Sequence, residues 1–168
     1  MKDNIININL ETSTAPVVSE SRGKEWISYG DANGEWSNLY PQFLIDLYYS
    51  SSITAAIVNA TSEMIAGENL IISDEDDRDL EAKIKLQSFM DRANSNESLH
   101  EVIKKVSFDF KLQGAFALNI VWSQDRTTIS EVYHVDVSKI RCARPDEMGR
   151  TTGYYISADW TNTRQNKP

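Results

Sequence analysis

Apolar residues recur at intervals of three and four along two stretches of the chain, the spacing of one helix face. The first helix is expected between a serine cap, Ser51 or Ser52, and Gly67. Its apolar positions are Ile53, Ala56, Ile57, Ala60, Met64 and Ile65. The second is expected from Ser98 to Gly114. Its apolar positions are Leu99, Val102, Ile103, Val106 and Phe110.

Local signals support these helices and predict two shorter ones. Glu101 stands three residues after Ser98, so the two residues form a capping box at the start of the second long helix. A proline is tolerated in the first turn of a helix, which predicts a short helix at 41–49. A short strand is expected at 69–73, and the acidic run 74–79 leads into a further helix. The apolar residues on one face of that helix are Leu80, Ile84 and Phe89.

After Gly114 the apolar period changes from helical to alternating, which predicts strands. The first two strands are separated by a tight polar turn at Gln124 to Arg126. Four strands are expected, at 115–122, 127–137, 138–143 and 152–160. The fold class is therefore α+β, with an amino-terminal arm and helices followed by an antiparallel β meander.

The pattern also divides the chain. Residues 1–24 are rich in Asn, Ser and Thr and are expected to form a flexible amino-terminal arm. Residues 25–160 form the α+β domain. Residues 161–168 follow a strand with no covering element, so we expect them to begin a connection into a longer protein.

Four large aromatic residues lie close together before the first helix. They are Trp26, Tyr29, Trp36 and Tyr40. Glycine, aspartate, asparagine and serine residues separate them, which predicts a loop. A short loop cannot bury four large rings by itself, and aromatic residues are frequent at protein interfaces. We therefore predict that these four residues contribute to a subunit interface.

Charge and cysteine content reduce the range of functions that the chain could have. Residues 1–100 carry 17 Asp or Glu and 7 Lys or Arg, whereas residues 101–168 carry 8 and 10. This acidic balance argues against tight binding of nucleic acid.

With Cys142 as the single cysteine, no intrachain disulfide forms, which favours folding in a reducing cell interior. The longest uncharged stretch, 47–62, is too short to span a bilayer.

The residues that commonly catalyse reactions are scarce. His100, His134 and Cys142 are the candidates, and none stands in a recognisable catalytic motif. His134 is expected on the solvated face of a strand, and Cys142 as a small packed side chain. The run 74–79 lacks the glycine and glutamate of a calcium loop. We therefore predict no catalytic residues, no cofactor and no metal.

Several segments together resemble tailed-bacteriophage portal proteins in order and spacing. The amino-terminal segments that carry the resemblance are Trp26–Gly30, Asn38–Leu47, Ser52–Ile57 and Ile65–Gly67. The later ones are Asp109–Trp122, where a helix ends in glycine and an apolar strand follows, and Glu131–Ile140. The long stem helices, clip and crown of the family have no counterpart in these 168 residues. The chain is therefore similar to the amino-terminal wing portion of a portal.

The resemblance implies a structural role in the virion. Portal proteins form a homo-oligomeric ring, usually of twelve subunits, at one capsid vertex through which DNA enters and leaves. The partners implied are the major capsid protein, the terminase and head-tail connector proteins, with double-stranded DNA passing through without sequence-specific binding. The ring is assembled in the host cytoplasm, no membrane takes part, and DNA is driven by the separate terminase.

Two other readings of the sequence stay open. The chain could be a free-standing interaction or adaptor domain that binds one protein through the segment 26–40. A small enzyme is the third reading, and it requires a cleft that brings His134 and Cys142 within hydrogen-bond reach.

Overall fold

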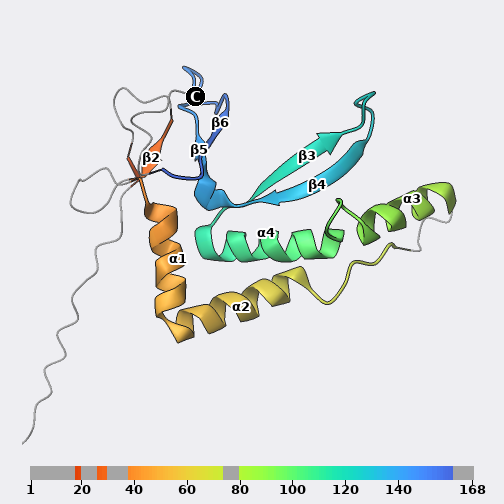
Figure 1. The fold of residues 1–168 in the computed structure, drawn as a ribbon, viewed down its shortest axis with the longest axis horizontal. Coiled ribbons are helices and arrows are strands. Elements are labelled where there is room, and N and C mark those ends of the chain that lie inside the picture. The colour runs from red at the N-terminus through yellow and green to blue at the C-terminus, as the bar shows by residue number, and fades with distance from the viewer. Residues whose placement is uncertain (1–17, 20–25, 30–37, 74–79, 161–168) are drawn as a thin grey trace, which may run out of the picture.

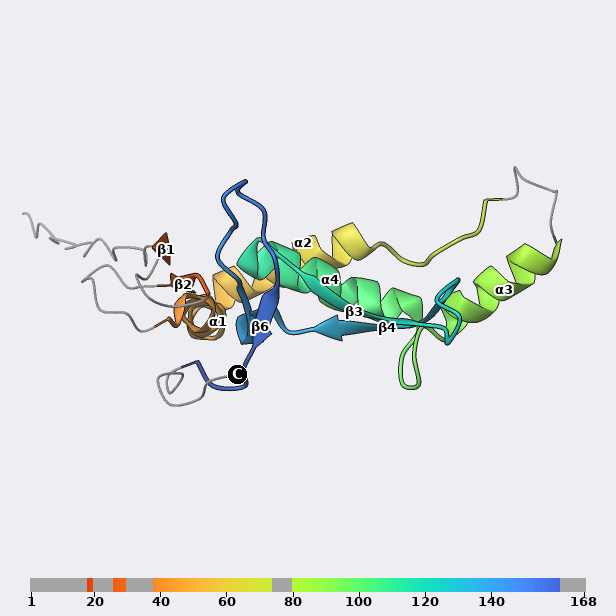
Figure 2. The same ribbon diagram turned by 90° about the horizontal axis from the view of Figure 1, so that it is seen from above.

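The computed structural model describes residues 18–19, 26–29, 38–73 and 80–160. Near the amino terminus it gives the backbone of two short paired strands, β1 (Val18–Ser19) and β2 (Ser28–Tyr29). The main body is layered: α2 (Ser52–Ala66) lies along one side of α4 (Leu99–Gln113). The hairpin of β3 (Ala117–Trp122) and β4 (Ile129–Val135) lies along the other side of α4 (Figure 1). Figure 2 shows α3 (Leu80–Asp91) at one end of α4. At the other end it shows α1 (Tyr40–Ser50) with the sheet of β5 (Ile140–Cys142) and β6 (Tyr154–Ile156).

The four helices follow the predicted pattern. They are α1 (Tyr40–Ser50), α2 (Ser52–Ala66), α3 (Leu80–Asp91) and α4 (Leu99–Gln113). The cap of α2 is Ser51, whose hydroxyl accepts a hydrogen bond from the Thr54 backbone N–H at 3.2 Å. Gly67 ends α2 with φ +72°, a conformation that costs glycine little. The expected cap and stop of this helix are therefore confirmed.

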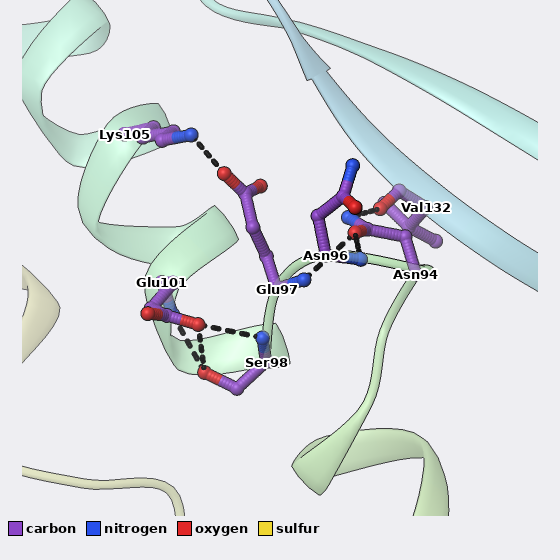
Figure 3. Close-up of polar contacts among 7 residues, drawn as sticks. All are labelled: Asn94, Asn96, Glu97, Ser98, Glu101, Lys105 and Val132. Carbon is purple, nitrogen blue, oxygen red and sulfur yellow. Dashed lines mark hydrogen bonds and ion pairs between the residues drawn. The ribbon is translucent and has the colours of Figure 1, made fainter.

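The predicted capping box of α4 is also confirmed (Figure 3). The Glu101 backbone N–H donates to the Ser98 hydroxyl, and the Glu101 carboxylate accepts from the Ser98 backbone N–H at 2.7 Å. The backbone hydrogen bond from Ser98, and after it the hydroxyl of Ser98, lowers the pKa of Glu101. At the other end Gly114 adopts the left-handed conformation, and its N–H donates to the Phe110 carbonyl.

Antiparallel strands follow the helices, which confirms the α+β class. They are β3 (Ala117–Trp122), β4 (Ile129–Val135), β5 (Ile140–Cys142) and β6 (Tyr154–Ile156). They form two separate pairs, β3–β4 and β5–β6, instead of one continuous meander. The division occurs because Val137–Lys139 forms a 3-10 turn, capped by the Asp136 carboxylate, between β4 and β5.

Two expected strands need correction. The segment 69–73 is irregular, and the Leu70 N–H donates to the Asn69 side chain at 2.8 Å instead of to a neighbouring strand. Alternation alone predicted a strand there, but a strand also needs a partner edge. The strand expected at 152–160 is reduced to β6, because Ser157 turns the chain by accepting a hydrogen bond from the Asp159 N–H.

The apolar core lies between α4 and β4 and is small. Its buried members are Ala93, Val102 and Val132, with Phe89, Leu99 and Val106 packed around them. A polar loop closes this core (Figure 3). The Val132 N–H donates to the Ala93 carbonyl at 2.9 Å, and the Asn94 side-chain amide donates to the Val132 carbonyl at 2.8 Å.

Asn94 is buried and uses its side-chain oxygen as well. This oxygen accepts hydrogen bonds from the backbone N–H groups of Asn96 at 2.8 Å and Glu97 at 2.9 Å. One side chain therefore shapes the turn before α4 and holds β4 against it. Glu97 adds an ion pair to Lys105 on the next turns of α4.

Replacing Asn94 with Ala should destabilise the fold strongly. The change removes three hydrogen bonds and leaves buried backbone groups without their partner, so we expect a loss of about 2–3 kcal/mol in the free energy of unfolding. Urea denaturation monitored by circular dichroism measures it. The matched control is Asn96→Ala, at an exposed position in the same turn, which should change stability by less than about 0.5 kcal/mol. Equal effects of the two variants would contradict this role of Asn94.

The turn between β3 and β4 is organised by Asp125. Its carboxylate accepts hydrogen bonds from the hydroxyls of Ser123 and Thr127 and from the Thr127 backbone N–H. Arg126 in the same turn has φ +56°. These bonds, with that from the Ser123 hydroxyl first, lower the pKa of Asp125 from 3.8 to about 2.

The hairpin turn should loosen when Asp125 is protonated. Because its pKa is lower when folded, its stabilising contribution is present above pH 3.8 and is lost as the pH falls towards about 2. Titration by NMR should place the carboxyl signal of Asp125 below that of an unfolded peptide. Asp125→Asn should abolish the associated shift changes in Thr127, whereas Glu147→Gln, in the β5–β6 turn, should preserve them. A pKa of Asp125 equal to that of an unfolded peptide would contradict these hydrogen bonds in the turn.

Candidate subunit interface

Trp26 packs inside its own chain. Its ring lies 5.5 Å from that of Tyr155, in a tilted arrangement, and 5.7 Å from that of Trp160, edge to face. The backbone is tied at the same place: Trp26 bridges to Ala143, and the Ile27 N–H donates to the Cys142 carbonyl at 2.9 Å. Trp26 therefore joins the amino-terminal segment to the β5–β6 sheet.

Trp160 connects this aromatic group to a buried cation. The Trp160 side chain is buried, and its indole N–H donates to the Lys139 carbonyl at 3.0 Å. The guanidinium carbon of Arg141 lies 4.8 Å from the centre of the Trp160 ring, a cation–π geometry. The aromatic rings thereby cover one side of Arg141.

Arg141, with 1% of its surface exposed, is the largest described side chain among those less than 2% exposed. Its Nε donates to the Asn38 side-chain oxygen at 2.9 Å and its Nη2 to the Asn38 carbonyl at 2.7 Å. Its Nη1 donates to the carbonyls of Ser138 and Ile140. Asn38 is buried too and has φ +58°, a conformation that asparagine tolerates better than most residues. These bonds fix Asn38, two residues before the start of α1, to β5.

Tyr40 begins α1 and lies apart from the Trp26 contacts. Its ring stacks on that of Phe43 at 6.5 Å. Tyr40 also lines a small cavity of about 130 Å³ with Pro41, Leu44, Gln113, Ala115 and Val137. The cavity lies where α1 meets the end of α4, and it is large enough for a small apolar side chain from elsewhere.

The other two predicted interface residues have no described side chain. For Tyr29 the structure gives the backbone, which pairs with Val18 in the β1–β2 ladder. Trp36 lies outside the described residues, as does the acidic run 74–79. The four aromatic residues are thus not shown as one cluster, and their role at a subunit interface stays a prediction.

The expectation for His134 is wrong. Instead of facing solvent, its Nε2 lies 2.7 Å from the Asp109 Oδ2 of α4, with 17% and 9% of the two side chains exposed. The correction has a physical reason: His134 stands two residues after Val132, whose side chain is in the core with Val102 of α4, so both side chains lie on the face of β4 that meets α4. The alternating pattern could not show which face of the strand is buried, because both faces carry apolar residues.

The described residues bring no catalytic group together. His134 bonds to Asp109, and no hydrogen bond joins it to Cys142, which is a half-buried free thiol. Within residues 38–73 and 80–160, no three His, Cys, Asp or Glu side chains are grouped to hold a metal ion. Among the described helices, none has the length and apolar character needed to cross a membrane.

Comparisons with known proteins add no identification. No family model matches the chain, and no similar protein is found among curated sequences.

Exchange of Arg141 for Lys should separate the amino-terminal segment from the β5–β6 sheet. A lysine cannot satisfy both Asn38 oxygens and the Ser138 carbonyl with the same planar geometry, so we expect a loss of about 2–4 kcal/mol in unfolding free energy. Thermal and urea unfolding of the variant measure it. The matched control, Arg150→Lys, changes an exposed arginine in the same sheet region and should be neutral. A stability equal to the parent would disprove the structural role of Arg141.

Proposed function

We propose that the chain is a structural subunit, the amino-terminal wing portion of a tailed-phage portal, and that it acts in a homo-oligomeric ring at the capsid vertex. The segments that resemble portal proteins support this proposal, and so does the observed order of helices and antiparallel strands. In this role the ring is the channel for DNA packaging and ejection. It also provides the docking site for the terminase and the head-tail connector.

The observation that carries the proposal is the amount of apolar surface left open. Large apolar side chains are exposed on several elements. They include Ile53, Ile57 and Met64 on α2, Leu118 and Ile120 on β3, and Tyr154 and Ile156 on β6. Soluble monomers rarely expose contiguous apolar faces, because such faces mark contacts with other chains. A closed ring covers two different faces of every subunit, which suits this distribution.

The charge of the chain fits passage of DNA better than binding of DNA. The net charge is −8, and residues 25–77 contain no Lys or Arg. A channel wall that gripped phosphates would resist sliding, whereas an acidic or neutral wall lets the duplex pass. No sequence-specific contact is expected, and the major capsid protein is the proposed partner around the ring.

The proposal predicts a closed ring and separate effects of two tryptophans. Native mass spectrometry and electron microscopy of the full chain should show one large species with an open centre.

Trp26→Ala should lower the unfolding free energy by about 2–3 kcal/mol, because Trp26 packs on Tyr155 and Trp160 of its own chain. Trp36→Ala should leave unfolding unchanged and weaken assembly by about tenfold or more if Trp36 is an interface anchor.

The outcomes are distinguishable. A chain that stays monomeric at every concentration would contradict the ring and favour the adaptor reading. Intact rings of the Trp36→Ala variant with unchanged stability would remove Trp36 from the interface while leaving the ring proposal standing.

A further inference from the structure

A groove of about 480 Å³ lies between α3 and the irregular segment 69–72, which follows α2. Its apolar lining comes from Leu70, Ile71 and Ile72 on one wall and from Ile84 of α3 on the other. Ile71 is 89% exposed and Ile84 is 61% exposed, and α3 has no buried side chain of its own. Both walls therefore present apolar side chains that no described element covers.

The backbone of the segment 69–72 is also available for pairing. This segment runs from α2 towards α3 without forming a helix or a strand (Figure 1). The Leu70 N–H donates to the side chain of Asn69, whereas Ile71 and Ile72 form no hydrogen bond in the described part of the chain. Free N–H and C=O groups on such a segment are a template for an added strand. The groove therefore suits an extended segment whose backbone pairs with 69–72 and whose alternate side chains contact α3.

The amino-terminal arm contains a segment with this pattern. Ile6, Ile8 and Leu10 alternate with Asn7 and Asn9. In a strand, this alternation places the three apolar side chains on one face and the two amides on the other. Neither proline nor glycine, which weaken strands, occurs in residues 1–15. The other segments outside the described residues show no such alternation, and they are 20–25, 30–37, 74–79 and 161–168.

The place where the arm joins the body favours a second copy as the donor. Val18 of β1 lies with α1 at one end of α4, whereas α3 lies at the other end (Figure 2). Val18 stands eight positions after Leu10, and eight residues span at most about 28 Å. α4 alone has 15 residues, which corresponds to a length of about 22 Å. The arm of the same chain would therefore have to be almost fully stretched, whereas a neighbouring copy has no such constraint.

We propose that residues 6–10 of one copy pair as an added strand with the segment 69–72 of a second copy. The side chains of Ile6, Ile8 and Leu10 fill the groove against α3. This contact rests on the proposed function for the presence of a neighbouring subunit, and it names one contact of the ring. Because the arm and the groove are different surfaces of each subunit, the contact is head-to-tail and repeats until the ring closes.

The first test removes the apolar face of the arm in the full chain. Ile6→Asn combined with Ile8→Asn should raise the protein concentration needed for assembly by about tenfold or more, because less apolar surface is buried in the contact. Analytical ultracentrifugation measures assembly, and circular dichroism should show unchanged folding. The matched control, Asn7→Ala combined with Asn9→Ala, changes the opposite face of the same strand and should assemble as the parent does. Equal assembly of the two double variants would overturn the proposal.

The second test changes the groove. Ile84→Asp should weaken assembly by about tenfold or more, because it buries an unpaired carboxylate beneath the arm. The matched control is Leu86→Asp on the same helix. Leu86 is 47% exposed but stands two positions further along α3, so it lies on a different face and its substitution should leave assembly unchanged. A weakening of the same size in both variants would contradict a contact at this groove.

Hydrogen exchange followed by mass spectrometry tests the backbone pairing. In the assembled parent, the amides of residues 69–73 should exchange about tenfold or more slowly than in the monomer, because hydrogen bonds to the arm protect them. The Ile6→Asn, Ile8→Asn variant should lose this protection at equal degrees of assembly. Protection that persists in this variant would show that another element covers the segment, and the proposal would then be wrong.

A disulfide test identifies the copy that donates the arm. Two batches of a Cys142→Ser chain are prepared, one with Ile8→Cys and the other with Ile84→Cys, and are then mixed and assembled. A disulfide that joins the two variants should form in the mixed sample and far less in either batch alone. A chain that carries both cysteines should also link to other copies. A disulfide closed within one monomeric chain would show that the same chain fills its own groove, which overturns the contact between copies.

The outcomes separate this inference from the proposed function. Rings that assemble normally with both the arm variant and Ile84→Asp would overturn the arm contact and leave the ring standing. The mixed disulfide in dimers or open chains would support the arm contact and contradict the portal ring. A chain that stays monomeric and forms no mixed disulfide would contradict both.

Discussion

The hydrogen bonds of the buried Arg141 guanidinium determine how the segment before α1 is held against the β5–β6 sheet. A cation that is 1% exposed loses its hydration, and this cost is offset only if its donors are used. Asn38, Ser138 and Ile140 supply four carbonyl or amide oxygens, and Trp160 covers the plane. These four acceptors come from the residue Asn38 and from the segment 138–140, so the site forms only when both segments are in place together.

This requirement explains why segments far apart in the sequence meet at β5. Asn38 and Arg141 are 103 positions apart, and the bond between them sets where α1 begins relative to the β5–β6 sheet. Asn94, before the first residue of α4, and the pair Asp109–His134, in the carboxyl-terminal half of α4, perform a similar task for β4. The apolar core between α4 and β4 has three buried residues among those that the structure describes. Polar contacts with fixed geometry therefore determine the relative positions of elements that apolar packing alone would hold loosely.

The sequence predicted the parts of the fold that local chemistry determines. The cap at Ser98 with Glu101 and the stop at Gly114 involve residues within one helix, so a linear pattern contains the whole signal. The turn around Asp125 is local in the same sense. The strand expected at 69–73 failed because strand formation depends on a distant partner edge, which no local pattern reveals.

The candidate site was harder to predict for the same reason. Aromatic residues at Trp26 and Tyr40 signalled contact surfaces, but the sequence did not indicate that Trp26 would meet Tyr155 and Trp160 of its own chain. No linear pattern singled out Arg141. Its burial depends on Asn38, and a single asparagine in a turn-rich segment gives no signal for a buried arginine. Likewise, the face of β4 that His134 occupies is the one on which Val132 packs against α4, and this contact between distant segments leaves no signal in the strand itself.

The small apolar core and the exposed apolar side chains of the subunit connect its folding with its assembly. A subunit with few enclosed residues is stabilised by any partner that binds its folded form, in proportion to the logarithm of partner concentration over Kd. The exposed apolar side chains of α2 and of β3 belong to elements on the two sides of α4, the helix that also carries Val102 and Asp109. A neighbouring subunit bound to either side would contact the elements that Asn94 and His134 already hold in place. In the proposed ring, each contact would therefore strengthen the subunit that makes it, because burial at the interface restrains the same hairpin and helix whose polar contacts define the fold.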